Sequence, residues 1–170
     1  MMKILLTNDD GYDAVGLKAL IKALTPIAKV MVVAPAKNKS ACGHSLTLDK
    51  PLRLISVDDE YYKIDDATPT DCIYLSLGHL FKNGYRPDLV ISGINIGANM
   101  GEDITYSGTA SAAMEAVIHG VPAIAISQVC KDMCRSIVVD WDFELACKVI
   151  LDLISKIKNG SCLFIYSKCK

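Results

Sequence analysis

Short apolar runs alternate with stretches of helical periodicity along this chain, and turn-forming residues separate them. Residues 3–7 form one apolar run, and residues 15–24 then place apolar side chains at helical spacing before a Thr-Pro pair. The β-branched run 29–35 follows and is closed by a proline. A strand, a helix and a strand within so short a span are typical of a parallel βαβ unit.

The same alternation continues through the rest of the chain. Strands are expected at residues 46–57 and 61–64, as a small hairpin or an extension of the sheet, and at 87–93, 121–127 and 162–166. Helices are expected after residue 68, from about Thr109 to His119, and from Asp142 to Lys158. This order predicts one α/β domain over residues 1–170, with a Rossmann-like, doubly wound and mostly parallel sheet flanked by helices.

The residues at the start of the helix expected after residue 68 are those that favour helix initiation. Thr68 is suited to the N-cap, Pro69 to the first helical position, and Asp71 lies three residues past the cap. We therefore interpret Asp71 as a residue that starts a helix and not as a catalytic acid.

The composition restricts the classes of partner. Hydrophobic residues make up 51% of the 170 residues and charged residues 22%, which is typical of a globular domain. The net charge of -1 provides no basic field for a nucleic-acid polymer or an anionic membrane surface. No apolar stretch approaches the roughly 20 residues that span a bilayer. The N-terminal apolar run is too short for a secretory signal, so a cytoplasmic location is expected.

Polar side chains follow three of the expected strands, at the point where each strand ends. Asp9 and Asp10 come directly after the first strand, Ser40 lies in the loop after the second, and the segment 92–116 begins at the end of the third. The carboxyl ends of parallel strands meet at one edge of a sheet, where ligands bind. We expect these three segments to form one site.

The residue types in that site favour a hard cation such as Mg²⁺ or Mn²⁺. Asp9 and Asp10 supply negative charge, while Ser40 and Asn95 supply neutral oxygens from neighbouring loops. A solvated turn is the alternative interpretation of two adjacent acids. The position of the pair at the end of a buried strand favours metal binding.

The stretch 106–116, YSGTASAAMEA, combines two hydroxyls with the start of a small-residue helix. Backbone N–H groups at a helix N-terminus, together with Ser107 and Thr109, suit a phosphate, although Ser and Thr are also ordinary helix caps. The glycines at 93, 97 and 101 match neither a dinucleotide-binding nor a P-loop pattern. His44, in the second loop, is either a solvated residue or an acid or base for the same site.

Several segments resemble, in order and spacing, the SurE family of survival-protein nucleotidases. They are MKILLTNDDGY, VVAPAKNKSACGHSLT, TPTDCIYLSL, LVISGINIGANMGEDITYSGTASAAMEA and GVPAIAIS, and the resemblance runs from the N-terminus to about Ser127. It implies a Rossmann-like, metal-dependent phosphatase that acts on 5'- and 3'-nucleoside monophosphates and on short polyphosphate.

The resemblance also implies a role for each site residue. It implies that Asp9, Asp10, Ser40 and Asn95 hold one divalent metal ion, with Asp9, Asp10 and Asn95 taking part in catalysis. It further implies that Asn99, Ser107, Gly108 and Thr109 bind the phosphate of the substrate.

Family members usually continue well past 170 residues, into a segment that takes part in oligomerisation. The end of this chain, GSCLFIYSKCK, differs from that continuation, so a C-terminally shortened chain is expected. The resemblance implies a homodimer or homotetramer for a chain with a complete C-terminal region.

Two alternatives to the nucleotidase stay open at the level of the sequence. An aspartyl-phosphate phosphatase of the haloacid-dehalogenase type would need an Asp-x-Asp pattern, whereas this chain has adjacent acids. A non-catalytic sensor of nucleotide or metal is consistent with the shorter C-terminus.

Overall fold

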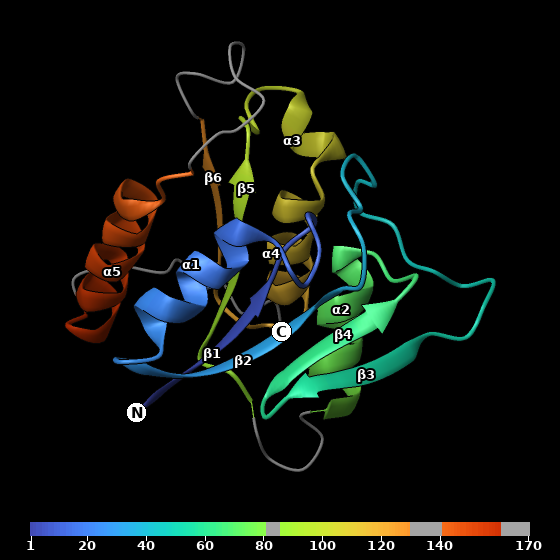
Figure 1. Ribbon diagram of the computed structural model, residues 1–170, viewed down its shortest axis with the longest axis horizontal. Coiled ribbons are helices and arrows are strands. Elements are labelled where there is room, and N and C mark those ends of the chain that lie inside the picture. Colours follow the sequence, from blue (N-terminus) through green and yellow to red (C-terminus); the bar gives the residue numbers. More distant parts are fainter. Residues whose placement is uncertain (81–85, 130–140, 161–170) are drawn as a thin grey trace, which may run out of the picture.

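The computed structural model describes residues 1–80, 86–129 and 141–160. Its strands are β1 (Met2–Thr7), β2 (Ala28–Pro35), β3 (Arg53–Asp58), β4 (Tyr61–Asp65), β5 (Leu89–Ile96) and β6 (Ala123–Gln128). Its helices are α1 (Val15–Leu24), α2 (Pro69–Leu75) with its π-helical continuation η1 (Ser76–Leu80), α3 (Asp103–Tyr106), α4 (Gly108–Ile118) and α5 (Glu144–Lys158). Together they form a single sheet covered by helices (Figure 1).

The sheet is mostly parallel, with the strand order β3-β4-β2-β1-β5-β6. β1 lies between β2 and β5 and is parallel to both, and β4 and β6 extend the sheet in the same direction. β3 pairs antiparallel to β4, so the expected hairpin extends the sheet, but its first strand begins at Arg53 and residues 46–52 are not part of a strand. The predicted Rossmann-like α/β fold is confirmed.

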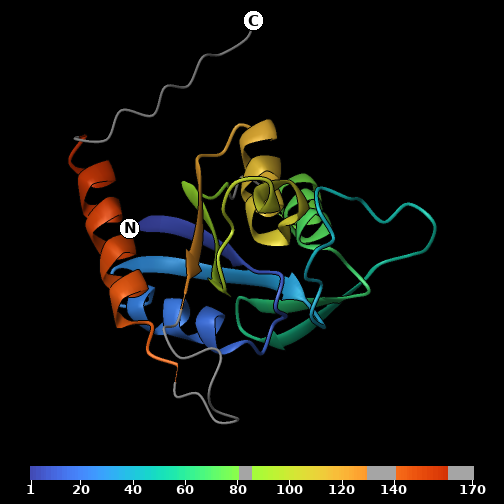
Figure 2. The ribbon, with the colours of Figure 1, turned by 90° about the horizontal axis from the view of Figure 1, so that it is seen from above.

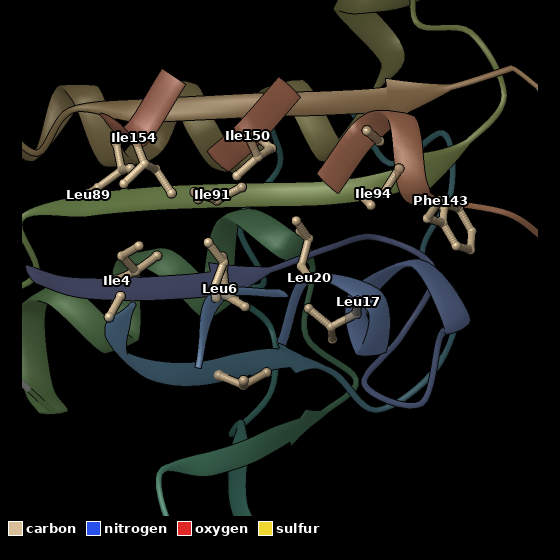
Figure 3. Close-up of a cluster of buried hydrophobic side chains, with 14 of the residues drawn as sticks. Ile4, Leu6, Leu17, Leu20, Leu89, Ile91, Ile94, Phe143, Ile150 and Ile154 are labelled. Atoms are coloured by element: carbon tan, nitrogen blue, oxygen red, sulfur yellow. The ribbon is translucent and has the colours of Figure 1, made fainter. Parts of the chain in front are cut away.

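Helices cover both faces of the sheet, which makes it doubly wound. α1 and α5 pack on one face, and α2 and α4 pack on the other (Figure 2). The side chains of β1 alternate between the two layers: Ile4 and Leu6 join the α1/α5 layer, which Figure 3 shows, and Leu5 joins the α2/α4 layer. Burial on both faces explains why the central residues 4–6 are all apolar and show no polar alternation.

The start of α2 follows the sequence signal closely. Thr68 and Asp71 form a capping box, in which the Thr68 hydroxyl accepts from the Asp71 N–H at 3.0 Å and the Asp71 carboxylate accepts from the Thr68 N–H at 2.8 Å. Asp71 also accepts hydrogen bonds from the backbone and the hydroxyl of Thr47. Its carboxylate is therefore occupied in structure, as the sequence indicated.

Other details differ from the sequence expectation. The last described helix begins at Glu144 and not at Asp142, whose side chain instead accepts a hydrogen bond from the Glu144 N–H. The short helix α3 was not predicted, and the expected strand at 162–166 lies outside the described residues. Within the described parts, no helix is both long enough and apolar enough to cross a membrane.

Candidate active site

The segments that follow β1, β2 and β5 meet at the carboxyl edge of the sheet, as the parallel topology requires. They enclose an open pocket of about 260 Å³, which we call the acidic pocket. Its lining residues are Asp9, Ser40, Ala41, Asn95, Ile96, Asn99, Asp103, Tyr106 and Ser107. Five of the eight site residues expected from the sequence therefore line one pocket, although they span about a hundred positions of the chain.

The turn after β1 explains why an amide and a glycine flank the two acids. The side-chain amide of the buried Asn8 donates to the Gly11 carbonyl at 2.9 Å and closes the turn. Gly11 has a φ of +108°, and a Cβ there would lie 3.2 Å from the carbonyl carbon of Lys37. Glycine is favoured at such a position because other residues rarely adopt this backbone conformation. Asn8 and Gly11 thus fix the backbone that carries Asp9 and Asp10.

Asp9 is held from two sides and is only 3% exposed. Its Oδ1 accepts a hydrogen bond of 2.6 Å from the hydroxyl of Thr109, at the start of α4. Its backbone carbonyl accepts from the N–H of Lys39, in the loop after β2, at 2.7 Å. Asp9 therefore joins all three segments of the site.

Asp10 is held more loosely and keeps one carboxylate oxygen without a partner. Asn38 donates a long hydrogen bond of 3.4 Å to its Oδ1, while Oδ2 is buried and accepts no hydrogen bond from any described residue. Burial and, second, the charge of Asp9 raise the pKa of Asp10. The ionised form of Asp10 is therefore disfavoured here, and a cation beside it would favour that form.

The amides from β5 and the loop after it carry oxygens suited to a ligand. Asn95 uses its NH₂ group to donate to the Gly97 carbonyl at 3.1 Å, and Asn99 donates to the Ser127 hydroxyl at 2.6 Å. Neither bond occupies the amide oxygen, and both side chains line the acidic pocket. Their oxygens are therefore available for a cation or a substrate hydroxyl.

The start of α4 packs directly against Asp9. Ser107 is the N-cap, and its hydroxyl accepts from the Ala110 N–H at 3.1 Å. A Cβ on Gly108 would lie 2.8 Å from Cβ and 3.2 Å from Oδ2 of Asp9, so no larger residue fits there without a shift. Thr109 contacts the Asp9 carboxylate with its hydroxyl and does not line the pocket. The first N–H groups of α4, which have no partner inside the helix, begin beside the carboxylate.

Asp103 and Tyr106, both in α3, line the pocket although sequence reasoning passed over them. Their only signal was proximity to the YSGT stretch in the segment GEDITYSGT. His44 does not line the pocket: its Nε2 lies 2.7 Å from the buried carboxylate of Glu115, which also contacts His119 at 3.0 Å. No lysine, arginine or histidine is among the described residues that line the pocket, so its fixed charges are negative.

The donor set fits a hard cation. The described parts of the chain contain no cluster of three or more His, Cys, Asp or Glu side chains, so a cation beside the two acids would need neutral oxygens to complete its ligands. Two adjacent carboxylates with a hydroxyl and an amide oxygen are instead the oxygen ligands of Mg²⁺ or Mn²⁺. The unpartnered Oδ2 of Asp10 is the observation that favours a cation, because a buried carboxylate oxygen is otherwise costly.

Fold and pocket together define an α/β protein of the Rossmann-like class with an acidic, hydroxyl-bearing candidate site at the carboxyl edge of its sheet. The family model "Survival protein SurE" matches residues 4–166, which extends the resemblance beyond Ser127. The chain belongs to the SurE family.

Relatives and a solved structure agree with this assignment. The chain is 75% identical to the 5'-nucleotidase SurE of Aliarcobacter butzleri (strain RM4018) over 95% of its length, and 62% identical to that of Sulfurovum sp. (strain NBC37-1) over 94%. It matches the crystal structure of the SurE protein from Aquifex aeolicus with a TM-score of 0.82 and 44% identity over 92% of this chain and 60% of that one. The chain spans 62% and 60% of the two nucleotidases.

Proposed function

We propose that this chain is a metal-dependent phosphatase that hydrolyses nucleoside 5'-monophosphates to nucleoside and phosphate. The observation that carries the proposal is the contact between Asp9 and the start of α4, which puts a candidate cation site and a candidate phosphate site side by side. The names of the curated relatives, 5'-nucleotidase SurE, supply the substrate class.

The charge of the pocket supports a metal. A phosphate dianion would be repelled by Asp9 and Asp103, since the described lining residues include no basic side chain. We propose that one Mg²⁺ or Mn²⁺ ion is held by Asp9, Asp10, Ser40 and Asn95. Such an ion, when bound, neutralises phosphate oxygens and lowers the pKa of a bound water.

Side chains and backbone N–H groups of the protein have separate roles in this proposal. Thr109 fixes the Asp9 carboxylate, whereas the free Oδ2 of Asp10 is suited to orient the attacking water. We propose that Asn99, Ser107 and the N–H groups of Gly108 and Thr109 bind the phosphate, where donors stabilise charge on the transferred group.

Further activities and partners follow from the family resemblance alone. We propose hydrolysis of 3'-monophosphates and short polyphosphate, a homodimer or homotetramer in the full-length protein, and a cytoplasmic location. None of these depends on the geometry of the acidic pocket.

The test is a matched pair of substitutions in the turn after β1. Asp9→Asn is expected to reduce Mn²⁺-dependent phosphate release from AMP by at least a hundredfold, while circular dichroism shows an intact fold. Asp13→Asn, which changes an exposed acid paired with Lys18 five residues later, is expected to keep near-normal release. Near-normal release by Asp9→Asn would contradict the proposal.

A further inference from the structure

A second hollow adjoins the acidic pocket and shares the side chain of Asn99 with it. It has a volume of about 420 Å³, and we call it the apolar pocket. Its lining residues are Ala98, Asn99, Met100, Ile104, Ala110, Ala125, Ser127 and Val129. The volume lies in the range of small-molecule sites, and a ligand that reaches past Asn99 would occupy both hollows.

Large apolar side chains border this hollow while remaining open to solvent. Met100 is 71% exposed, Ile104 is 45% exposed and Val129 is 61% exposed. They come from the loop after β5, from α3 and from the position just after β6, so three segments contribute to one apolar surface. Contiguous apolar surface of this kind marks a binding site more often than a scattered exposed residue does.

The polar groups of the apolar pocket are few and uncharged. Asn99 donates to the Ser127 hydroxyl at 2.6 Å, which holds the amide at the boundary between the two hollows. The described residues that line the apolar pocket include no charged side chain. A flat, uncharged ring that carries a few hydrogen-bonding atoms fits such a surface, whereas a second phosphate does not.

We propose that the apolar pocket is the subsite for the base of the nucleotide whose phosphate binds in the acidic pocket. This inference rests on the proposed function and names the part of the chain that selects nucleotides over other phosphate esters. Met100 and Ile104 supply apolar contact to the base, and Asn99 supplies the hydrogen-bonding group nearest to it. The only polar groups that the described lining residues offer to the base are one uncharged amide and the hydroxyl that it contacts. The pocket therefore discriminates only modestly between different bases, and more strongly between phosphate esters with a base and those without one.

Ala125→Leu tests the subsite by filling it. Ala125 is exposed on β6 and lines the apolar pocket but not the acidic pocket, so a larger side chain enters the hollow without touching the candidate metal ligands. We expect the Kd for adenosine, measured by NMR titration, to rise at least tenfold. The kcat/KM for AMP falls by a similar factor, while that for glycerol phosphate, which has no base, stays within twofold of the wild-type value.

A pair of methionine substitutions provides the control. Met100→Ala removes an apolar wall of the subsite and is expected to weaken adenosine binding about threefold to tenfold. Met114→Ala removes an equally flexible side chain that is 50% exposed on α4 and lines neither hollow, and it is expected to change nothing. Equal effects of the two substitutions would contradict the subsite.

Adenosine binding tests the subsite, and phosphate release tests the proposed function, so the two can fail separately. If wild type fails to bind adenosine, or if Ala125→Leu binds it as tightly as wild type, the subsite is overturned even where AMP is hydrolysed. Equal losses on AMP and glycerol phosphate in Ala125→Leu also overturn it. Absence of phosphate release from every ester with Mg²⁺ or Mn²⁺ overturns the proposed function instead, and adenosine binding still decides whether the pocket takes a base.

Discussion

At the scale of single residues, Asp9 is the point where the three site segments meet. It follows β1, its carbonyl holds the loop after β2, and its carboxylate holds the start of α4. A small change beside Asp9 should therefore affect activity more than stability. Gly108 and Thr109 are the two neighbours that test this statement.

Gly108→Ala is expected to reduce turnover at least tenfold. The added Cβ would meet Asp9 at 2.8 Å and the Pro69 ring at 3.0 Å, so the carboxylate must move. Alanine favours a helix over glycine by up to about 1 kcal/mol, so the loss would not come from helix stability. Gly78→Ala, at a helical position with no atom within 4 Å of the new Cβ, is the control and should keep full activity.

Thr109→Val is expected to weaken metal-dependent turnover by about 10- to 100-fold. The substitution keeps the shape but removes the donor to a buried carboxylate, and hydrogen bonds to charged groups contribute about 1.5–3 kcal/mol. Thr109→Ser retains the hydroxyl and should retain most of the activity. Equal kinetics for the valine and serine variants would show that the hydrogen bond has no part in positioning Asp9.

The sequence predicted those site residues that directly follow a strand, because parallel topology alone brings such positions to one edge. Asp9, two residues past β1, belongs to this group, and Asn95 lies at the carboxyl end of β5 itself. Asp103 and Tyr106 were not predicted because they lie in α3, which follows a glycine-rich loop. This helix has four residues and is too short to show a hydrophobic period. The spacing of residues along the sequence also could not show that the Thr109 hydroxyl donates to the Asp9 carboxylate, because this contact depends on how α4 packs against the turn after β1.

At the scale of elements, the sequence predicts a helix well where it contains a clear hydrophobic period or capping residues. The helix from Val15 to Leu24 agrees with its hydrophobic pattern at both ends, and the cap at Thr68 has the expected partners. The π-helical turn that continues α2 has no comparable sequence signal. Its hydrogen bonds join residues five apart instead of four, and the hydrophobic pattern of so short a turn does not reveal this.

Thr68→Ala is expected to lower the free energy of unfolding by about 1 kcal/mol, the usual cost of an N-cap. For a domain of this size, that loss corresponds to a Tm lower by roughly 2–4 °C. The KM for AMP should stay unchanged, because Thr68 does not line the acidic pocket. A large rise in KM with an unchanged Tm would mean that the cap acts on the site and not on α2.

At the scale of the whole molecule, the fold gathers negative charge at one edge of its sheet. Asp10 has a raised pKa, so the folded protein binds its proton more tightly than the unfolded chain does. The resulting contribution to stability is full below the unfolded pKa of about 3.8 and is lost as pH rises through the folded pKa. A cation at the proposed site would reverse this balance, because it would bind the ionised carboxylates.

Mn²⁺ at a hundred times its Kd is therefore expected to stabilise the protein by about 2.7 kcal/mol at pH 7. The corresponding rise in Tm is roughly 5–10 °C, measured by scanning calorimetry. The rise should shrink as pH falls toward 4, where protons compete for the two acids. Asp10→Asn should abolish most of it, whereas an equal rise in that variant would locate the cation elsewhere.

In the proposed site, two adjacent acids, a hydroxyl from the loop after β2 and an amide from the end of β5 surround one cation. Anomalous diffraction from a crystal grown with Mn²⁺ measures this directly. We expect one strong peak about 2 Å from oxygens of Asp9, Asp10, Ser40 and Asn95. A crystal with no peak among these four side chains, or with its strongest peak at another place on the protein, would contradict it.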